Sequence, residues 1–167
     1  MLKHILPIPM PDDYLIAIGR VMVNWSQLEG IVDLVLIKLL GSTVTDGRAH
    51  IVFAQMTFQA KLDSLKAIAE LLATNPNNTS PHAKFTREIY PKLRNFQIQR
   101  NSIAHCRWVV VDDSVSKTRL QARGKLKISN GSVALEDMNK LADDIQQLSN
   151  EVWVMVQFDE FNNPSYK

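Results

Sequence analysis

The amino-acid sequence predicts a mainly α-helical protein: an up-and-down bundle of four to five helices with a β-hairpin inserted before the C-terminal helix. Two observations predict this fold. Apolar residues recur every three or four positions through several long stretches, as they do on one face of a helix. Between about 107 and 128 this period gives way to β-branched residues and to alternating apolar and polar positions, which are typical of strands.

The chain has 167 residues, which is long enough for one domain with a substantial core. We expect an extended N-terminal arm over 1–11, a single domain over 12–160 and a frayed tail over 161–167. The single cysteine excludes an intrachain disulfide and indicates a reducing compartment. The N-terminus lacks the pattern of a signal peptide, and the longest apolar run, 31–40, contains two charges and is too short to span a bilayer. A cytoplasmic protein without membrane association is therefore expected.

The first three helices are marked by their apolar stripes and their caps. A long helix over 14–40 is apolar over more than half of its circumference, so we expect it to be buried against its own bundle and to have room for a second subunit. A short helix is expected over 46–55. Thr57 is expected to cap the next helix, whose stripe consists of Phe58, Leu62, Leu65, Ala69 and Leu72.

A loop is expected at 75–79, after which Ser80 and Pro81 form an N-cap and first-turn pair. The helix that they begin should run to about Cys106, with an interruption near Pro91. The hairpin then consists of a strand over 107–112, a turn at 113–116 and a strand over 117–128, and Asn130-Gly131 forms another turn. The stripe of the final helix is formed by Leu135, Met138, Leu141, Ile145, Leu148, Val152 and Met155.

Two charged residues occupy positions that the helical period assigns to the core. Arg100 lies in the stripe between Phe96 and Ile103, and Glu29 lies between Trp25 and Val32. A charge buried alone is costly, so each needs a partner. We expect Glu29 to pair with Arg100, either directly or across a dimer interface. The alternative is a buried ion pair that only fixes the register of the helices.

His105 adds chemistry to Arg100. Asn101 and His105 are four residues apart and share a helix face, and a long arginine side chain can reach beside them. Cleavage of RNA through its own 2′-hydroxyl needs a group that moves a proton and donors that stabilise a phosphorane-like state; histidine and arginine supply these. Asn101 could position the phosphate or the histidine, and no metal or cofactor is called for. One histidine supplies only an acid or a base, so a two-fold dimer would complete the pair. The alternative is a hydrogen-bonded structural histidine.

The motif Arg100-Asn101-Ser102-Ile103-Ala104-His105, near the end of a bundle helix, resembles the signature of HEPN domains. The resemblance implies an all-α bundle that dimerises, with the motif helices of both copies forming a composite ribonuclease cleft whose products carry a 2′,3′-cyclic phosphate and a 5′-hydroxyl. It also implies a toxin, phage-defence or RNA-processing role, often beside an antitoxin of the nucleotidyltransferase type. The hairpin departs from the bare bundle and leaves the subgroup open. Arg94-Asn95 starts a similar pattern, but Gln99 stands where the histidine would be.

The middle of the chain is basic. Residues 80–127 hold eleven lysines and arginines against three acidic residues, a local net charge of +8, which suits a polyanion such as RNA. On the strand over 117–128, the basic side chains share one face and the apolar side chains share the other. The alternative is an edge strand that lysines protect from aggregation. The residues expected to bind RNA are Arg94, Arg107, Arg119, Arg123, Lys125 and Lys127.

Three functions remain open from the sequence. The first is the metal-independent endoribonuclease, and the second is a catalytically inactive dimer that binds nucleic acid or nucleotide in the same cleft. The third is a helical protein-interaction module in which Glu29 and Arg100 are only structural. The remaining histidines, His4, His50 and His82, show no metal-ligand spacing.

Overall fold

The computed structural model describes residues 9–43, 45, 47–73, 80–111, 114–123 and 125–157. The fold is mainly α with a small antiparallel sheet before the C-terminal helix, as the sequence predicts. The predicted loop at 75–79 and most of the predicted arm and tail lie outside the described residues. In order, the elements are α1 (Asp12–Leu39), α2 (Gly47–Ala54), α3 (Phe58–Leu72), α4 (Pro81–Lys84), the π-helical η1 (Phe85–Ile89), α5 (Tyr90–Ala104), β1 (Arg107–Val111), β2 (Ser114–Arg123), β3 (Lys125–Ser132) and α6 (Leu135–Gln157).

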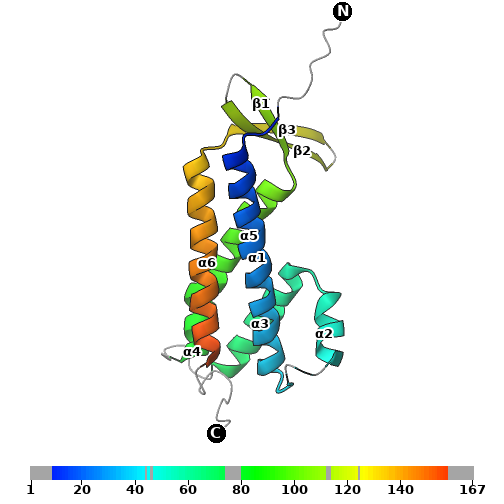
Figure 1. Ribbon diagram of the computed structural model, residues 1–167. Helices are drawn as coiled ribbons and strands as arrows, with labels where there is room; N and C mark the ends of the chain where they lie inside the picture. Colours follow the sequence, from blue (N-terminus) through cyan, green and yellow to red (C-terminus); the bar gives the residue numbers. More distant parts are fainter. Residues whose placement is uncertain are drawn as a thin grey trace, which may run out of the picture.

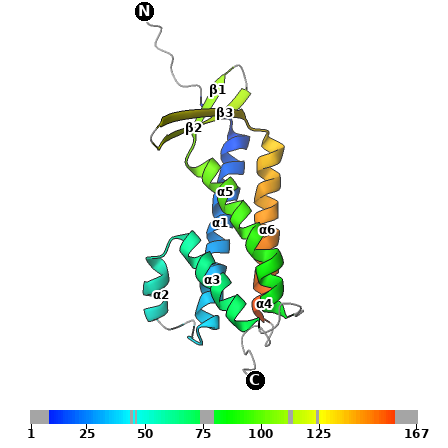
Figure 2. The same ribbon diagram turned by 180° about the vertical axis from the view of Figure 1, so that it is seen from behind.

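Helices α1 and α6 lie side by side and run in the same direction (Figure 1). Their hydrogen bonds join residues at a nearly constant separation: the Tyr14 hydroxyl donates to the Val133 carbonyl at 2.9 Å, and the Asn24 side-chain amide donates to the Ala142 carbonyl at 2.8 Å. Helix α5 runs the opposite way behind them (Figures 1 and 2). The starts of α1 and α6 therefore meet the end of α5 at one end of the bundle, and the sheet lies across that end.

The predicted caps begin α3 and α4. The Thr57 hydroxyl accepts a hydrogen bond from the Ala60 amide at 3.2 Å, and the Ser80 hydroxyl accepts one from the Ala83 amide at 3.3 Å. All five apolar residues of the predicted α3 stripe are buried. Four of them, all except Leu72, belong to the same core cluster as seven buried residues of α1, which are Val21, Trp25, Leu28, Val32, Val35, Leu36 and Ile37.

The interruption expected near Pro91 is present. The five residues of η1 precede α5, and the Tyr90 amide donates to the Phe85 carbonyl five residues back. Pro91 has no N–H to continue the usual ladder, which explains why the helix widens here. Helix α5 then ends at Ala104, with His105 at its C-cap, two residues before the predicted end.

The predicted hairpin is part of a three-stranded meander in the order β1-β2-β3, so the sheet has one strand more than predicted. The predicted strand over 117–128 is two strands, and the chain reverses between Arg123 and Lys125, which are register partners. Odd-numbered residues pair with odd-numbered residues across this turn. The alternation of polar and apolar residues therefore continues from β2 into β3, and the sequence alone reads as one long strand. Asn130 and Gly131 lie within β3, paired with β2, and form no turn. No helix in the described ranges has both the length and the apolar character needed to cross a membrane.

Candidate functional site

Arg100 lies on the face of α5 that meets α1, and its charge is accommodated by an aromatic ring. The guanidinium carbon lies 5.4 Å from the centre of the Trp25 ring. Trp25 is 1% exposed. Its ring makes a T-shaped contact with the ring of Phe58 of α3, and the two ring centroids are 4.5 Å apart. An arginine above a desolvated indole gains a favourable cation–π interaction. The core position of Arg100 is therefore filled by a stacked guanidinium.

Asn101 also contacts the guanidinium of Arg100. Its side-chain oxygen accepts a hydrogen bond from Arg100 Nη1 at 3.1 Å. Arg100 Nε is buried and finds no acceptor among the described residues, and the same is true of the neighbouring Trp25 Nε1. Two unsatisfied buried donors are unusual in a folded protein, where such groups are normally paired. The arginine is thus oriented by the chain, but its hydrogen-bonding capacity is not used up.

His105 follows the last turn of α5. Its backbone amide donates to the Asn101 carbonyl at 3.2 Å, which fixes the residue at the C-cap, while the side chain is exposed. In the part of the chain that the structure describes, the imidazole makes no hydrogen bond. The structure therefore brings the side chains of Arg100 and Asn101 into direct contact. It leaves the side chain of His105 exposed at the end of the same helix, without a hydrogen bond to either of them.

Glu29 does not pair with Arg100 within the described residues of one chain. It is partly buried on α1, one turn after Trp25, and Arg100 meets the helix at Trp25. Direct pairing within the chain, as the sequence predicts it, is therefore not formed, and only the predicted pairing across a dimer interface remains. Helical period identifies which face a residue occupies, but it does not specify which turn of the neighbouring helix the residue meets.

A different ion pair, between Asp33 and Lys61, joins α1 to α3. Lys61 Nζ lies 2.7 Å from Asp33 Oδ1 and donates to Oδ2 at 2.9 Å, and the Lys61 side chain is only 9% exposed. This pair is not among the interactions predicted from the sequence, although the sequence holds two signals for it. Asp33 interrupts the apolar run over 31–40, and Lys61 immediately precedes Leu62 in the α3 stripe.

Arg94 lies on α5 among groups of α3 rather than beside His105. Asp63 accepts hydrogen bonds from Gln59 Nε2 at 2.6 Å and from the Tyr90 hydroxyl at 3.1 Å. The hydrogen bond from Gln59, with smaller contributions from Tyr90 and from the charges of Arg94 and Lys66, lowers the pKa of Asp63. The charge of Arg94 is therefore partly balanced by a carboxylate.

The basic residues expected on the sheet are divided between its two faces. Arg107 pairs with Thr118 in register and shares the outer face with Val109, which is 40% exposed. Arg119 lies on the opposite face of β2, the face on which Val115 is buried against the bundle. In the backbone register, Arg123 pairs with Lys125, and Lys127 pairs with Gln121. Since β2 is the central strand, protection of an edge can explain the lysines of β3 but not the basic residues of β2.

Lys117 ties this sheet to the motif helix. Its Nζ donates to the Ser102 hydroxyl at 3.0 Å, inside the motif itself. The single cysteine, Cys106, donates from Sγ to the Ile103 carbonyl at 3.3 Å. Burial raises the pKa of the Cys106 thiol, and the charge of Lys117 opposes this in part, so the thiol has the character of a structural group.

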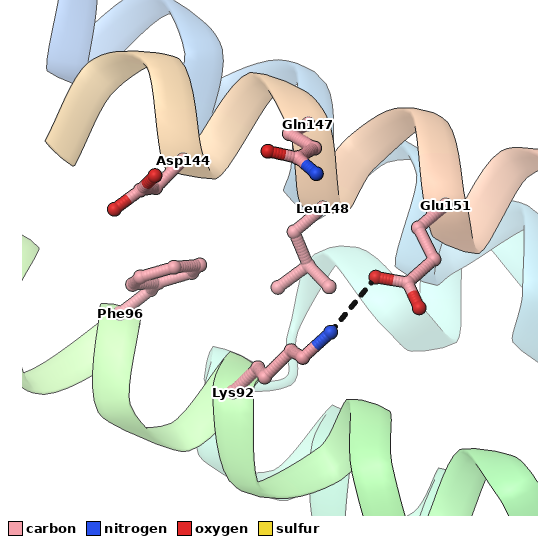
Figure 3. Close-up of a pocket in the computed structure, with 6 residues that line it drawn as sticks. All are labelled: Lys92, Phe96, Asp144, Gln147, Leu148 and Glu151. Carbon is pink, nitrogen blue, oxygen red and sulfur yellow. Dashed lines mark hydrogen bonds and ion pairs between the residues drawn. The ribbon is translucent and has the colours of Figure 1, made fainter. Parts of the chain in front are cut away.

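Among the described residues, two pockets flank α5, and neither is lined by Arg100, Asn101 or His105. One, of about 200 Å³, lies between α5 and α6 and is bordered by the ion pair of Lys92 and Glu151 at 3.0 Å (Figure 3). Phe96 and Leu148 form its apolar wall, and Asp144 and Gln147 border it. The other, of about 300 Å³, lies between α5, the sheet and the start of α6; it is lined by Ile98, Gln99, Ser102, Ile103, Lys117, Ser132, Val133, Asp137, Met138 and Leu141.

The described residues hold no group of three or more histidine, cysteine or acidic side chains placed to bind a metal ion together. The end of α5 presents a guanidinium held by Trp25 and Asn101 and, five residues further along the chain, an exposed imidazole. A guanidinium can bind a phosphate, and an imidazole can move a proton. No protein-family model matches the sequence, and neither a characterised protein nor a solved structure shows significant similarity to it.

Proposed function

We propose that this protein is an endoribonuclease of the HEPN type, which cleaves RNA through the RNA's own 2′-hydroxyl and needs no metal ion. The observation that supports the proposal is the arrangement of Arg100. Its guanidinium lies over the Trp25 ring and is bonded once, to Asn101, and its other N–H groups have no acceptor among the described residues. Since Nε is buried, the remaining Nη groups are the donors suited to phosphate oxygens, and the exposed side chain of His105 follows on the same helix.

In the proposed reaction, His105 accepts the proton of the 2′-hydroxyl while the 2′-oxygen attacks the adjacent phosphorus. The bond from phosphorus to the 5′-oxygen breaks, and the leaving oxygen takes a proton from a general acid. Arg100 balances the added negative charge on the phosphate oxygens, and Asn101 keeps the guanidinium in place. The products are a 2′,3′-cyclic phosphate and a 5′-hydroxyl. The general acid is His105 of a second copy, so the active form is a homodimer.

The resemblance to HEPN domains supports the biological part of the proposal. On that basis the protein is a toxin or phage-defence effector that acts on RNA in the cytoplasm, and an antitoxin of the nucleotidyltransferase type holds it in check. The single cysteine, which suits a reducing compartment, agrees with this location.

A second function is favoured by one observation. A catalytic base is usually oriented by a third group, and the imidazole of His105 has no hydrogen-bonding partner in the described ranges. The alternative is therefore a catalytically inactive HEPN-like dimer that binds nucleic acid, nucleotide or another protein through the same residues.

The test is RNA cleavage by the purified protein in the presence of a chelator. Wild type should cut single-stranded RNA, and His105→Ala should lose cleavage while keeping its fold and its affinity for RNA. His50→Ala, which changes an exposed histidine on α2, is the matched control and should cleave like wild type. Binding without cleavage by the wild type supports the second function. Cleavage by His105→Ala at the wild-type rate contradicts the proposal.

A further inference from the structure

The pocket of about 300 Å³ between α5, the sheet and the start of α6, which we call the α5–sheet pocket, plays no part in the proposed reaction. It lies at the end of the bundle where the sheet meets these two helices (Figure 2). Its wall is apolar, because Ile103, Met138 and Leu141 line it and each is at most 5% exposed. Ile98, which also lines it, is 60% exposed, so the pocket is open to solvent there. An apolar pocket with a few polar groups is the usual form of a small-molecule site.

The polar groups of the α5–sheet pocket have bonding capacity to spare. Lys117 of β2 donates to the Ser102 hydroxyl at 3.0 Å, which leaves two of the three N–H donors of its ammonium group without an acceptor among the described residues. Asp137, in the first turn of α6, is exposed and forms no hydrogen bond or ion pair with any described residue. The pocket therefore suits an occupant that offers acceptors to an ammonium group and donors to a carboxylate.

Guanine has this combination on one edge. A carboxylate accepts two parallel N–H bonds through its two oxygens. Among the four bases of RNA, only guanine carries two adjacent N–H donors on its pairing edge, N1–H and the 2-amino group. Its O6 acceptor lies beside them and is a common partner of lysine. The flat ring also suits the apolar wall, where the thioether of Met138 can contact an aromatic ring favourably.

We infer that the α5–sheet pocket binds a guanine base of single-stranded RNA. Asp137 accepts from N1–H and from the 2-amino group, and Lys117 donates to O6. Proteins read single-stranded RNA in this way, through bases that leave the stack and are bonded at their edges. The inference deepens the proposed function, and it rests on that function only for RNA as the source of the base.

The α5–sheet pocket lies on the His105 side of α5. Ser102, which lines the pocket, is three residues before His105, whose amide still bonds to the Asn101 carbonyl in the helical manner. At 100° per residue, Ser102 and His105 are about 60° apart around the helix axis, whereas Ser102 and Arg100 are about 160° apart. A base in the pocket therefore belongs to a nucleotide near the 2′-hydroxyl that gives its proton to His105. The cleaved bond should lie at a fixed number of nucleotides from a guanine.

The first test is the binding of three nucleoside monophosphates, followed by the NMR shifts of the backbone amides of the ¹⁵N-labelled protein. GMP, IMP and AMP carry the same ribose and 5′-phosphate, so a difference in affinity reports the base alone. GMP should shift the amides of the pocket, such as those of Ser102 and Asp137. IMP lacks the 2-amino group and should bind about tenfold more weakly; AMP, which lacks O6 and N1–H, should bind more weakly still. Equal affinities, or no shifts at the pocket, overturn the inference.

Two variants test the carboxylate. Asp137→Asn keeps the size of the side chain but replaces an acceptor oxygen by a donor, and it should weaken GMP binding by about tenfold or more. Glu136→Gln is the matched control, because Glu136 is an exposed carboxylate in the same turn but does not line the pocket. It should bind GMP like wild type. A GMP affinity that Asp137→Asn leaves unchanged, or that both variants reduce equally, overturns the inference.

A second test identifies RNA as the source of the base. His105→Ala, which should not cut RNA, should bind a uridine oligonucleotide with one guanine about tenfold more tightly than the same oligonucleotide with inosine there. Such a preference, with a wild type that cleaves no RNA, leaves the inference standing and contradicts the proposed function. Cleavage without preference for guanine leaves the proposed function standing and overturns the inference. GMP binding without a preference among the oligonucleotides makes a free guanine nucleotide the occupant and overturns the assignment to RNA.

Discussion

The guanidinium carbon of Arg100 lies 5.4 Å from the centre of the Trp25 ring, at a position where the period of α5 calls for an apolar residue. A cation–π contact of this kind contributes about 0.5–2 kcal/mol. It offsets part of the cost of partly burying the charge without neutralising it, as a carboxylate would. Arg100 therefore keeps its full positive charge for a phosphate, which a pair with Glu29 would have reduced.

Arg100→Leu separates stability from function. The change removes a favourable ring contact but also removes a buried Nε without an acceptor, a defect that costs about 1–3 kcal/mol. We expect the free energy of unfolding, measured by urea denaturation, to stay within about 1 kcal/mol of wild type, while RNA cleavage falls below detection. Full cleavage by a folded Arg100→Leu protein would mean that Arg100 is only structural.

The Asp33–Lys61 pair should matter more for stability than any exposed pair. Lys61→Met leaves the Asp33 carboxylate partly buried without its cation, and we expect a loss of about 2–4 kcal/mol in the free energy of unfolding. Lys66→Met breaks an exposed pair with Glu70 and should cost less than about 0.5 kcal/mol. Replacing both members of the buried pair, as Asp33→Leu with Lys61→Met, should recover most of the loss. If the double variant is as unstable as Lys61→Met, the carboxylate is not the source of the cost.

Asp63 should give the protein part of its acid sensitivity. The pKa of Asp63 is lowered in the folded state from its ordinary 3.8, chiefly by the Gln59 hydrogen bond. The ionised Asp63 carboxylate therefore contributes its full stabilisation above pH 3.8, its ordinary pKa. This stabilisation is lost as the pH falls through the lower pKa that Asp63 has in the folded state. Asp63→Asn should flatten the fall in unfolding free energy below about pH 4, and Gln59→Ala should flatten it in part. If the unfolding free energy of both variants falls with decreasing pH as steeply as that of wild type, this cluster does not stabilise the fold.

RNA binding should depend on one face of the sheet. Arg119 shares its face with Lys117, which touches the motif helix, whereas Arg107 lies on the outer face. We expect Arg119→Ala to weaken the binding of single-stranded RNA and to reduce the slope of log affinity against log salt by about 0.7, the value for one lost phosphate contact. Arg107→Ala is the matched control. The prediction fails if the two variants have the same slope.

The sequence predicts the helical part of this fold well, because caps and stripes are local. Thr57 caps α3 and Ser80 begins α4 as predicted, since each needs only the amide three residues ahead. Pro91 predicts the widened helical turn that precedes it, because its missing N–H interrupts the hydrogen-bond ladder of the same helix.

Pairing between distant elements is less accessible to sequence reasoning. The Asn130-Gly131 turn signal is overridden because both residues pair with β2. Two acidic residues of α1, Glu29 and Asp33, interrupt apolar stretches. The helical period does not distinguish them, although Asp33 pairs with a lysine and Glu29 lies one turn after Trp25, the residue that Arg100 contacts. At the candidate site, the motif was found from its residue types, but the role of Trp25 depends on how two helices cross.

The most direct test of the central claim is the chemistry of the RNA ends. A short RNA of defined sequence is incubated with the protein and a chelator, and the fragments are analysed by mass spectrometry. We expect a 2′,3′-cyclic phosphate on the upstream fragment and a 5′-hydroxyl on the downstream one, with neither formed by His105→Ala. Fragments with a 3′-hydroxyl and a 5′-phosphate, or cleavage that His105→Ala retains, would contradict the proposed reaction.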